Sequence, residues 1–142
     1  MSKLQSTTIS SPIGKLYLLA RDETVLGLNL SGFHDLLSTL SPQELEEKIN
    51  QVKRIQNLSD KLLDYFDGDL RSINSIKVRQ PGGEFSQAAW SAMRRIKAGT
   101  VDSYADLAHN AGSPAAVRAA GSACAKNKII LIVPCHRVVK TG

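Results

Sequence analysis

At 142 residues, the chain is long enough for one ordinary domain or two small ones. Hydrophobic residues make up 42% of it, and no run of about 18 apolar residues is present, which excludes a membrane-spanning helix. The net charge of +5 falls entirely on residues 81–142, because residues 1–80 carry equal numbers of basic and acidic side chains. A basic half beside a neutral half favours a polyanionic partner, although a merely basic soluble surface explains the charge equally well.

The N-terminus and the cysteine content predict an intracellular protein. Residues 1–11 lack the apolar segment of a secretory signal peptide, so we expect a cytoplasmic location, or a nuclear one in a eukaryote. A structural disulfide between Cys124 and Cys135 is not expected in a reducing compartment. Three scattered histidines and the lack of a Cys-x-x-Cys pair argue against a zinc site.

Residues 1–80 are predicted to form a small α/β domain. Three strand candidates separated by turn-like residues indicate an antiparallel meander: Leu4–Ile9, Lys15–Ala20 and Val25–Leu30. Ser41-Pro42-Gln43-Glu44 is typical of a helix start, with serine as the N-cap and glutamate closing a capping box. The apolar stripe of this helix is predicted to contain Leu45, Ile49 and Val52.

The rest of this half predicts one more helix and one more strand. The helix is expected near Ser59–Phe66, with Leu62, Leu63 and Phe66 buried, and the strand within Ser72–Val78. The carboxylates of Glu44, Glu46 and Glu47 are interpreted as a solvated helix face. No catalytic constellation is evident in these residues.

Gln80-Pro81-Gly82-Gly83 predicts a boundary between a domain of residues 1–80 and one of residues 81–142, because proline and two glycines interrupt both helices and strands. Beyond it, apolar residues recur at helical spacing and predict a helix with Gly99 after its end. Trp90 lies beside this apolar face and is expected to anchor the core. The face consists of Phe85, Ala88, Ala89, Ala92, Met93 and Ile96.

Two short helices joined by a glycine-containing turn come next, which is the layout of a helix-turn-helix. The first is predicted to begin at Ser103, in a Ser-x-x-Asp signature, and to end at Gly112. The second is predicted to have Ser113 as its N-cap and Pro114 as its first residue. Its buried face is predicted to hold Val117, Ala120, Gly121 and Cys124, the last as an inert thiol.

Arg118 is predicted to point outward from the second helix, among the small residues Ala115, Ala119 and Ser122. A helix surface of small residues with one projecting arginine can approach DNA closely. The alternative is a plain helical hairpin whose small residues only permit tight packing. The basic charge of this half favours the DNA interpretation.

Ile132-Val133-Pro134-Cys135-His136-Arg137-Val138-Val139 places a thiol beside two potential cations. A strand-like run from Ile129 is predicted to end at Pro134, which lacks an N–H group. The thiolate is the nucleophilic form of cysteine, and nearby positive charge favours it, so Cys135 is a candidate nucleophile. A single cysteine is, however, more often a small buried hydrophobic residue.

Together these motifs resemble the O6-alkylguanine-DNA alkyltransferases, the family of methylated-DNA–protein-cysteine methyltransferases. The resemblance is carried by Pro-Cys-His-Arg-Val-Val at 134–139, Ser-Tyr at 103–104, Arg118 in Val-Arg-Ala-Ala-Gly, and Asn127 eight residues before the cysteine. It implies an α+β protein with two domains. The N-terminal domain would be ribonuclease H-like with an antiparallel sheet, and the C-terminal domain mostly helical, winged-helix-like and built on the helix-turn-helix.

The resemblance implies single-turnover DNA repair by a monomer. The substrate would be double-stranded DNA containing O6-alkylguanine, and no metal or organic cofactor would be needed. O4-methylthymine is left open as a second substrate. Cys135 would accept the alkyl group, with His136 as a base acting through a water, because adjacent side chains point in different directions. The remaining roles implied are base rotation for Tyr104, filling of the base gap for Arg118, support of the active-site turn for Asn127, and DNA contacts for Ser113 and Thr141. The leaving guanine also needs a proton donor on its oxygen, for which Tyr104 is the candidate.

Members of this family continue past the position of Gly142 with a loop that lines the alkyl pocket and a helix bearing a glutamate that orients the histidine. The expectation from the sequence is therefore a fragment or truncated product. Other functions weighed are a lesion-binding protein without chemistry, which retention of Cys135 disfavours, and an inactive fragment. A regulator with a cysteine-rich metal domain is excluded by the two cysteines, and a thiol protease or redox enzyme explains neither Arg118 nor the basic half.

Overall fold

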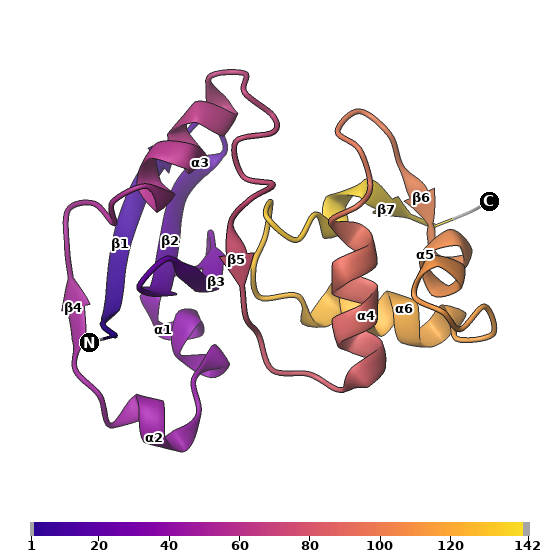
Figure 1. Cartoon of the computed structure of the whole chain (residues 1–142), viewed down its shortest axis with the longest axis horizontal. Coiled ribbons are helices and arrows are strands. Elements are labelled where there is room, and N and C mark those ends of the chain that lie inside the picture. The colour runs from indigo at the N-terminus through magenta and orange to yellow at the C-terminus, as the bar shows by residue number, and fades with distance from the viewer. Residues whose placement is uncertain (1, 141–142) are drawn as a thin grey trace. The chain divides into compact units, whose positions relative to one another are not determined.

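A computed structural model describes residues 2–140 of the chain. The chain divides into two compact units, Met1–Gln80 and Pro81–Gly142. In Figure 1 the first unit runs from indigo to magenta and the second from salmon to yellow. The division falls at the Pro81-Gly82-Gly83 segment, and both units combine helices with strands, so the protein has an α+β fold.

The first unit is built on a five-stranded sheet. The strands β1 (Leu4–Ser11), β2 (Gly14–Arg21) and β3 (Thr24–Asn29) form the predicted antiparallel meander. Two short strands extend it in parallel at the edges, β4 (Ile49–Gln51) beside β1 and β5 (Lys77–Val78) beside β3. The order across the sheet is therefore β4-β1-β2-β3-β5.

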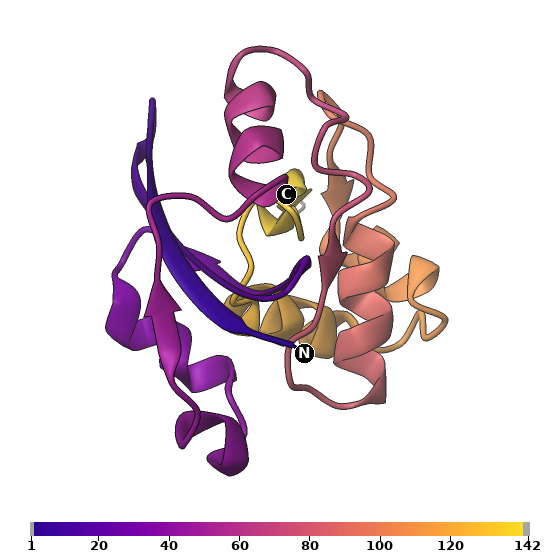
Figure 2. The ribbon, with the colours of Figure 1, turned by 60° about the vertical axis from the view of Figure 1, so that its left-hand side comes forward.

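Helices cover both faces of this sheet. They are α1 (Phe33–Leu36), the 3-10 turn η1 (Leu37–Thr39), α2 (Pro42–Leu45) and α3 (Leu58–Phe66). Figure 2 shows α1 and α3 on opposite sides of the meander. Leu36 of α1 packs with Leu4, Leu19 and Leu26 of the strands in one hydrophobic cluster. A Cβ at Gly27 would lie 2.9 Å from the end of the Leu36 side chain, so a larger residue there would have to displace that side chain.

A helix is predicted from Ser41 through Val52, but only its first turn forms, so the rest of this prediction is wrong. The capping box between Ser41 and Glu44 is present, but α2 ends at Leu45, whose side chain is exposed. The chain then enters β4, where Ile49 pairs with Leu4 and the Val52 N–H donates to the Ser6 carbonyl. Pairing with the sheet edge thus overrides the helical spacing of the apolar residues.

Two other predictions in this unit need correction. The helix expected at Ser59–Phe66 begins at Leu58, which is buried, whereas Leu63 is 45% exposed and does not belong to the core. The strand expected over Ser72–Val78 is reduced to its last two residues in β5, because residues 70–75 form successive turns. These turns are closed locally by backbone hydrogen bonds.

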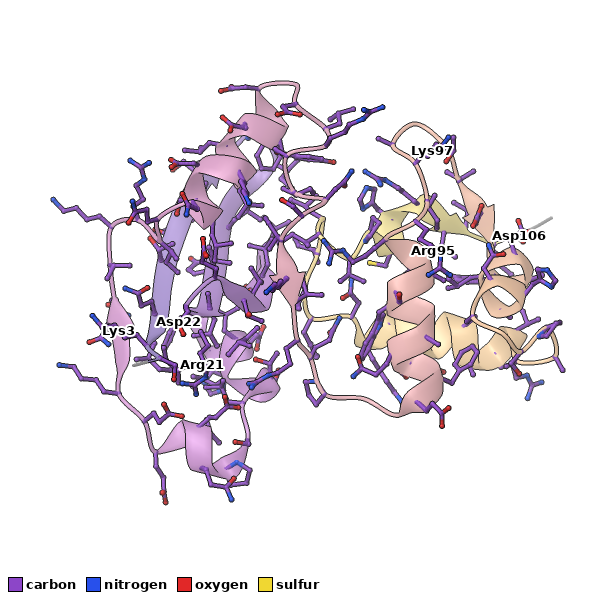
Figure 3. The ribbon with its side chains drawn as sticks, in the orientation of Figure 1. Lys3, Arg21, Asp22, Arg95, Lys97 and Asp106 are labelled. Carbon is purple, nitrogen blue, oxygen red and sulfur yellow. The ribbon has the colours of Figure 1, made fainter. Side chains whose placement is uncertain are left out.

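Glu44 is buried in an ion cluster, so its interpretation as part of a solvated face is wrong. Its carboxylate pairs with Arg79 at 2.6 Å and with Arg21 at 3.0 Å, and it accepts the Ser41 N–H. Figure 3 shows Arg21 at the end of β2 nearest to α2. Burial by itself raises the pKa of Glu44, but hydrogen bonds from Arg79, Ser41 and Arg21 outweigh it and lower that pKa to about 2.

The second unit is mostly helical. It contains α4 (Glu84–Met93), α5 (Tyr104–Asn110), α6 (Val117–Lys126) and the 3-10 turn η2 (Cys135–Arg137). Two short strands, β6 (Asp102–Ser103) and β7 (Val138–Val139), pair in parallel. Within residues 2–140, no helix has the length and apolar character needed to cross a bilayer.

Trp90 anchors the core of this unit. Its side chain is buried, and its indole N–H donates to the Ala123 carbonyl at 2.8 Å, which ties α4 to α6. Gly82 lies beneath the ring, where a Cβ would come within 2.6 Å of the indole. The predicted apolar face of α4 continues through a turn to the buried Ile96, but the helix itself ends at Met93, so Gly99 lies well beyond its C-cap.

The ion cluster makes the stability of the first unit depend on acidity. The folded-state pKa of Glu44 lies below its ordinary value of 4.5, so its contribution is present above that pH and is lost as the pH falls toward about 2. We expect Glu44→Gln to lower the free energy of unfolding at pH 7 by about 1–2 kcal/mol, allowing for solvent screening around the half-exposed Arg79.

Urea denaturation followed by circular dichroism at pH 7 and pH 3 measures this effect. The loss caused by Glu44→Gln should shrink at the lower pH. The matched control is Glu46→Gln, which removes an exposed carboxylate from the same segment. Equal losses in the two variants at pH 7 would contradict the role of the cluster.

Candidate functional site

Cys135 lies in a compact turn that Asn127 holds together. Asn127 is the C-cap of α6, and its side-chain amide donates to the Val133 carbonyl at 2.8 Å. Its side-chain oxygen accepts the Ile129 N–H at 3.1 Å, so one side chain bridges the start and the end of the loop. The Val133 carbonyl also accepts the Cys135 N–H at 2.9 Å. The position of Cys135 is thus tied directly to the end of α6.

The strand predicted from Ile129 to Pro134 is not present. Only Ile129 makes an isolated β-bridge, and within the segment the Val133 N–H donates to the Ile129 carbonyl at 3.1 Å and the Ile132 N–H to the Ile130 carbonyl at 2.7 Å. Leu131 adopts a left-handed conformation with φ of 68°, which costs a residue with a Cβ about 1–2 kcal/mol. Ile129, Ile132 and Val133 are buried in the core, whereas Ile130 and Leu131 are partly exposed.

Arg137 fixes the other side of the turn. Its guanidinium donates to the Ile96 carbonyl at 2.8 Å, just after α4, and its N–H donates to the Pro134 carbonyl at 3.0 Å. The carbonyls near a helix C-terminus lack helical partners, so a cationic donor there satisfies one of them. No local sequence pattern predicts this anchor, because it links positions 41 residues apart.

His136 follows Cys135 on the same turn and is exposed. The protein atoms on one side of its imidazole partly desolvate it, which lowers its pKa below the ordinary value, and the positive charge of Arg137 adds to the effect. The imidazole is therefore neutral at pH 7 and is able to accept a proton. Cys135, the residue before it, is half-buried.

Tyr104 is the first residue of α5, directly after β6. The pairing of β6 with β7 sets Asp102 against Val138 and Ser103 against Val139. Tyr104 therefore follows one end of this two-stranded sheet, whereas η2 precedes the other end. The Ser103–Asp106 capping box expected from the sequence is present, and the Ser103 hydroxyl accepts the Asp106 N–H at 3.0 Å.

The helix-turn-helix layout is present as α5 and α6, with a different start for the second helix. Gly112 ends α5 in the left-handed conformation, and the Ser113 N–H donates to the Ala108 carbonyl at 3.0 Å. Ser113, however, is not the N-cap of α6. Its carbonyl accepts the Ala116 N–H in a tight turn with Pro114 at the second position, which proline suits as well as a first helical position.

Arg118 is the second residue of α6 and is exposed, with Ala119 and Ser122 exposed beside it. The buried side of α6 carries Ala120 and Ala123, so the predicted inclusion of Val117, which is 39% exposed, is wrong. Val117 opens the first turn, which lies at the edge of the core. Thr141, the last DNA-contact candidate, lies outside the described residues.

Cys124 occupies the last turn of α6 and is half-buried. Burial raises the pKa of its thiol to about 11, and the neighbouring Cys135 adds to the rise. Cys124 is therefore a protonated thiol at neutral pH. Among the described side chains, no three His, Cys, Asp or Glu residues gather as a metal-binding group.

Comparison with known proteins gives concordant matches. The family model described as "6-O-methylguanine DNA methyltransferase, DNA binding domain" matches residues 84–142. The chain is 36% identical over 135 residues to the constitutive methylated-DNA–protein-cysteine methyltransferase of Bacillus subtilis, covering 94% of this chain and 79% of that protein. It is 34% identical over 144 residues to the enzyme of that name from Salmonella typhimurium, covering 98% and 84%.

A solved structure is similar along most of its length. The Mycobacterium tuberculosis OGT in complex with DNA superposes with a TM-score of 0.73 at 29% identity, over 96% of this chain and 79% of that one. The O6-methylguanine methyltransferase of the same organism gives a TM-score of 0.74 at 29% identity, over 97% and 79%. The likeness therefore extends over both units.

The Asn127 side chain should matter more to stability than its size suggests. Asn127→Ala removes the donor to Val133 and the acceptor of the Ile129 N–H, both in the half-buried turn. We expect a loss of about 1–3 kcal/mol in the free energy of unfolding, measured by urea denaturation followed by tryptophan fluorescence. Asn110→Ala is the matched control, because its side-chain amide makes an exposed 3.4 Å bond to Asp102. A control loss as large as that of Asn127→Ala would refute the assignment.

Proposed function

Because the chain belongs to the family of methylated-DNA–protein-cysteine methyltransferases, we propose that Cys135 accepts the alkyl group that these enzymes remove from DNA. The protein is thus a DNA-repair enzyme that acts by direct alkyl transfer. The observation that carries the assignment of Cys135 is its half-buried thiol on a turn anchored at both sides, by Asn127 and by Arg137. This turn lies inside the segment that matches the DNA-binding domain of the family.

The proposed reaction is a displacement at the alkyl carbon. The Cys135 sulfur attacks that carbon, a carbon–sulfur bond forms, and the bond between the carbon and the guanine O6 breaks. The thiol proton passes to the neutral His136, through a bridging water because the two residues are adjacent. Guanine leaves after taking up a proton, for which Tyr104 is the proposed donor. The thioether is stable in water, so each molecule reacts once.

The substrate oxygen is buried in a base pair, so the nucleotide has to leave the stack first. We assign the filling of the resulting gap to Arg118, because its flat guanidinium stacks well on bases. Its exposed place in the first turn of α6, beside small residues, supports this assignment. The N–H groups at that helix end also suit a DNA phosphate.

Several finer assignments belong to the same proposal. The substrate is double-stranded DNA carrying O6-alkylguanine, bound by a monomer in the compartment that holds the DNA. Ser113, in the turn before α6, and Thr141 are proposed DNA contacts. In fold terms, the first unit is proposed to be ribonuclease H-like and the second winged-helix-like. Support comes from the meander of the first unit and the helix-turn-helix with its small β6–β7 sheet in the second.

Incubation with a duplex that contains O6-methylguanine tests the central assignment. We expect one equivalent of substrate to raise the mass of the peptide containing Cys135 by one CH₂ unit, with no turnover afterwards. Cys135→Ser should lose the transfer completely, whereas Cys124→Ser should keep it. Tight binding of the lesion without any mass change would instead identify a lesion-binding protein.

Arg118 should matter only when the base has to be extruded from a duplex. We expect Arg118→Ala to slow methyl transfer from the duplex by roughly 10–100-fold, because unstacking a base costs a few kcal/mol. Transfer from the free O6-methylguanine base should keep its rate. Lys126→Ala removes the same charge from the other end of α6 and is the matched control. Equal slowing with the duplex and the free base would contradict the role in base extrusion.

A further inference from the structure

The two cysteines of the chain are joined by a short path of hydrogen bonds. The Asn127 N–H donates to the Cys124 carbonyl at 3.3 Å, and the Asn127 side chain donates to the Val133 carbonyl at 2.8 Å. That carbonyl also accepts the Cys135 N–H at 2.9 Å. The last turn of α6 is therefore held beside the turn that carries Cys135.

The exposure of the two thiols and the pKa of Cys124 also connect the pair. Both thiols are free and half-buried, so neither is sealed from small solutes. After burial, the second cause of the raised pKa of Cys124 is the charge on Cys135. Cys124 has no part in the proposed alkyl transfer and no disulfide partner, although it is the chain's only other cysteine.

We propose that Cys124 is a resolving cysteine, which captures peroxide-oxidised Cys135 in a reversible intramolecular disulfide. This inference deepens the proposed function, because it concerns the same acceptor sulfur. In a protein whose acceptor cysteine reacts only once, oxidation of that sulfur to the sulfinic or sulfonic acid inactivates the molecule before it has repaired any DNA. A second thiol within reach diverts the first oxidation product into a state that a reductant restores.

The chemistry balances with a peroxide as the oxidant. The Cys135 sulfur attacks one peroxide oxygen, the O–O bond breaks, and a sulfenic acid and one water form. The Cys124 sulfur then attacks the Cys135 sulfur, the S–O bond breaks, and the hydroxyl leaves with the Cys124 proton as a second water. Two thiols are oxidised and one hydrogen peroxide is reduced to two waters. A dithiol reductant reverses the reaction by exchange.

Oxidation of the full chain by hydrogen peroxide, followed by proteolysis and mass spectrometry, tests the proposal. We expect the intact protein to lose the mass of two hydrogens and to yield a linked pair of peptides containing Cys124 and Cys135. Methyl transfer should disappear and should return after treatment with dithiothreitol. In Cys124→Ser, which is close in size, the same exposure should yield sulfinic acid at Cys135 and activity that dithiothreitol does not restore.

The outcomes separate this proposal from the proposed function. The linked peptides are detected by mass, so their detection does not depend on methyl transfer. If the unoxidised protein fails to transfer a methyl group, the proposed function is overturned, but the disulfide can still be found. Equal recovery of wild type and Cys124→Ser after reduction would overturn the resolving role. Disulfide dimers on a non-reducing gel, in place of the internal link, would overturn it as well. Cys124→Ala provides a second variant if the serine hydroxyl disturbs folding.

Discussion

A single backbone oxygen, the carbonyl of Val133, is the point on which the site depends. It accepts hydrogen bonds from the side chain of Asn127 and from the N–H of Cys135, so it joins the end of α6 to the reactive turn. The loop between them has no ladder of strand bonds, and it also bears the cost of the left-handed Leu131. Burial of the neighbouring Ile129, Ile132 and Val133 side chains offsets that cost.

The second unit is held together by donors from side chains to backbone carbonyls at the ends of helices. Trp90 reaches Ala123, Arg95 reaches Asn110 and Arg137 reaches Ile96. Helices of seven to ten residues leave a large share of their carbonyls without helical partners. Side-chain donors to these carbonyls therefore stabilise the unit and fix the position of one helix relative to the next segment. In the first unit, by contrast, the backbone ladder of the meander organises the fold, and one ion cluster around Glu44 adds polar stability.

Local signals in the sequence predicted local structure well. The β1–β3 meander, the capping box at Ser103 and the end of α5 at Gly112 are each encoded within a few residues. Two features set by distant partners escaped prediction, β4 where a helix was expected and the Arg137 anchor. The turn at 129–133 also escaped prediction, because its apolar, strand-like residues are closed by bonds to one another and to Asn127. The residues of the reactive turn were found from their motif, whereas the hydrogen bond from Arg137 to the Ile96 carbonyl joins that turn to a segment 41 residues away.

Trp90 gives the molecule an optical reporter that distinguishes its two units. It is the only tryptophan of the chain, and its indole is buried on Gly82 and bonded to α6. Fluorescence excited at the indole band therefore originates in the second unit, while the first unit contributes only tyrosine emission. A shift of that emission toward longer wavelengths marks the separation of α4 from α6, so the opening of the DNA-binding unit can be timed independently of the sheet.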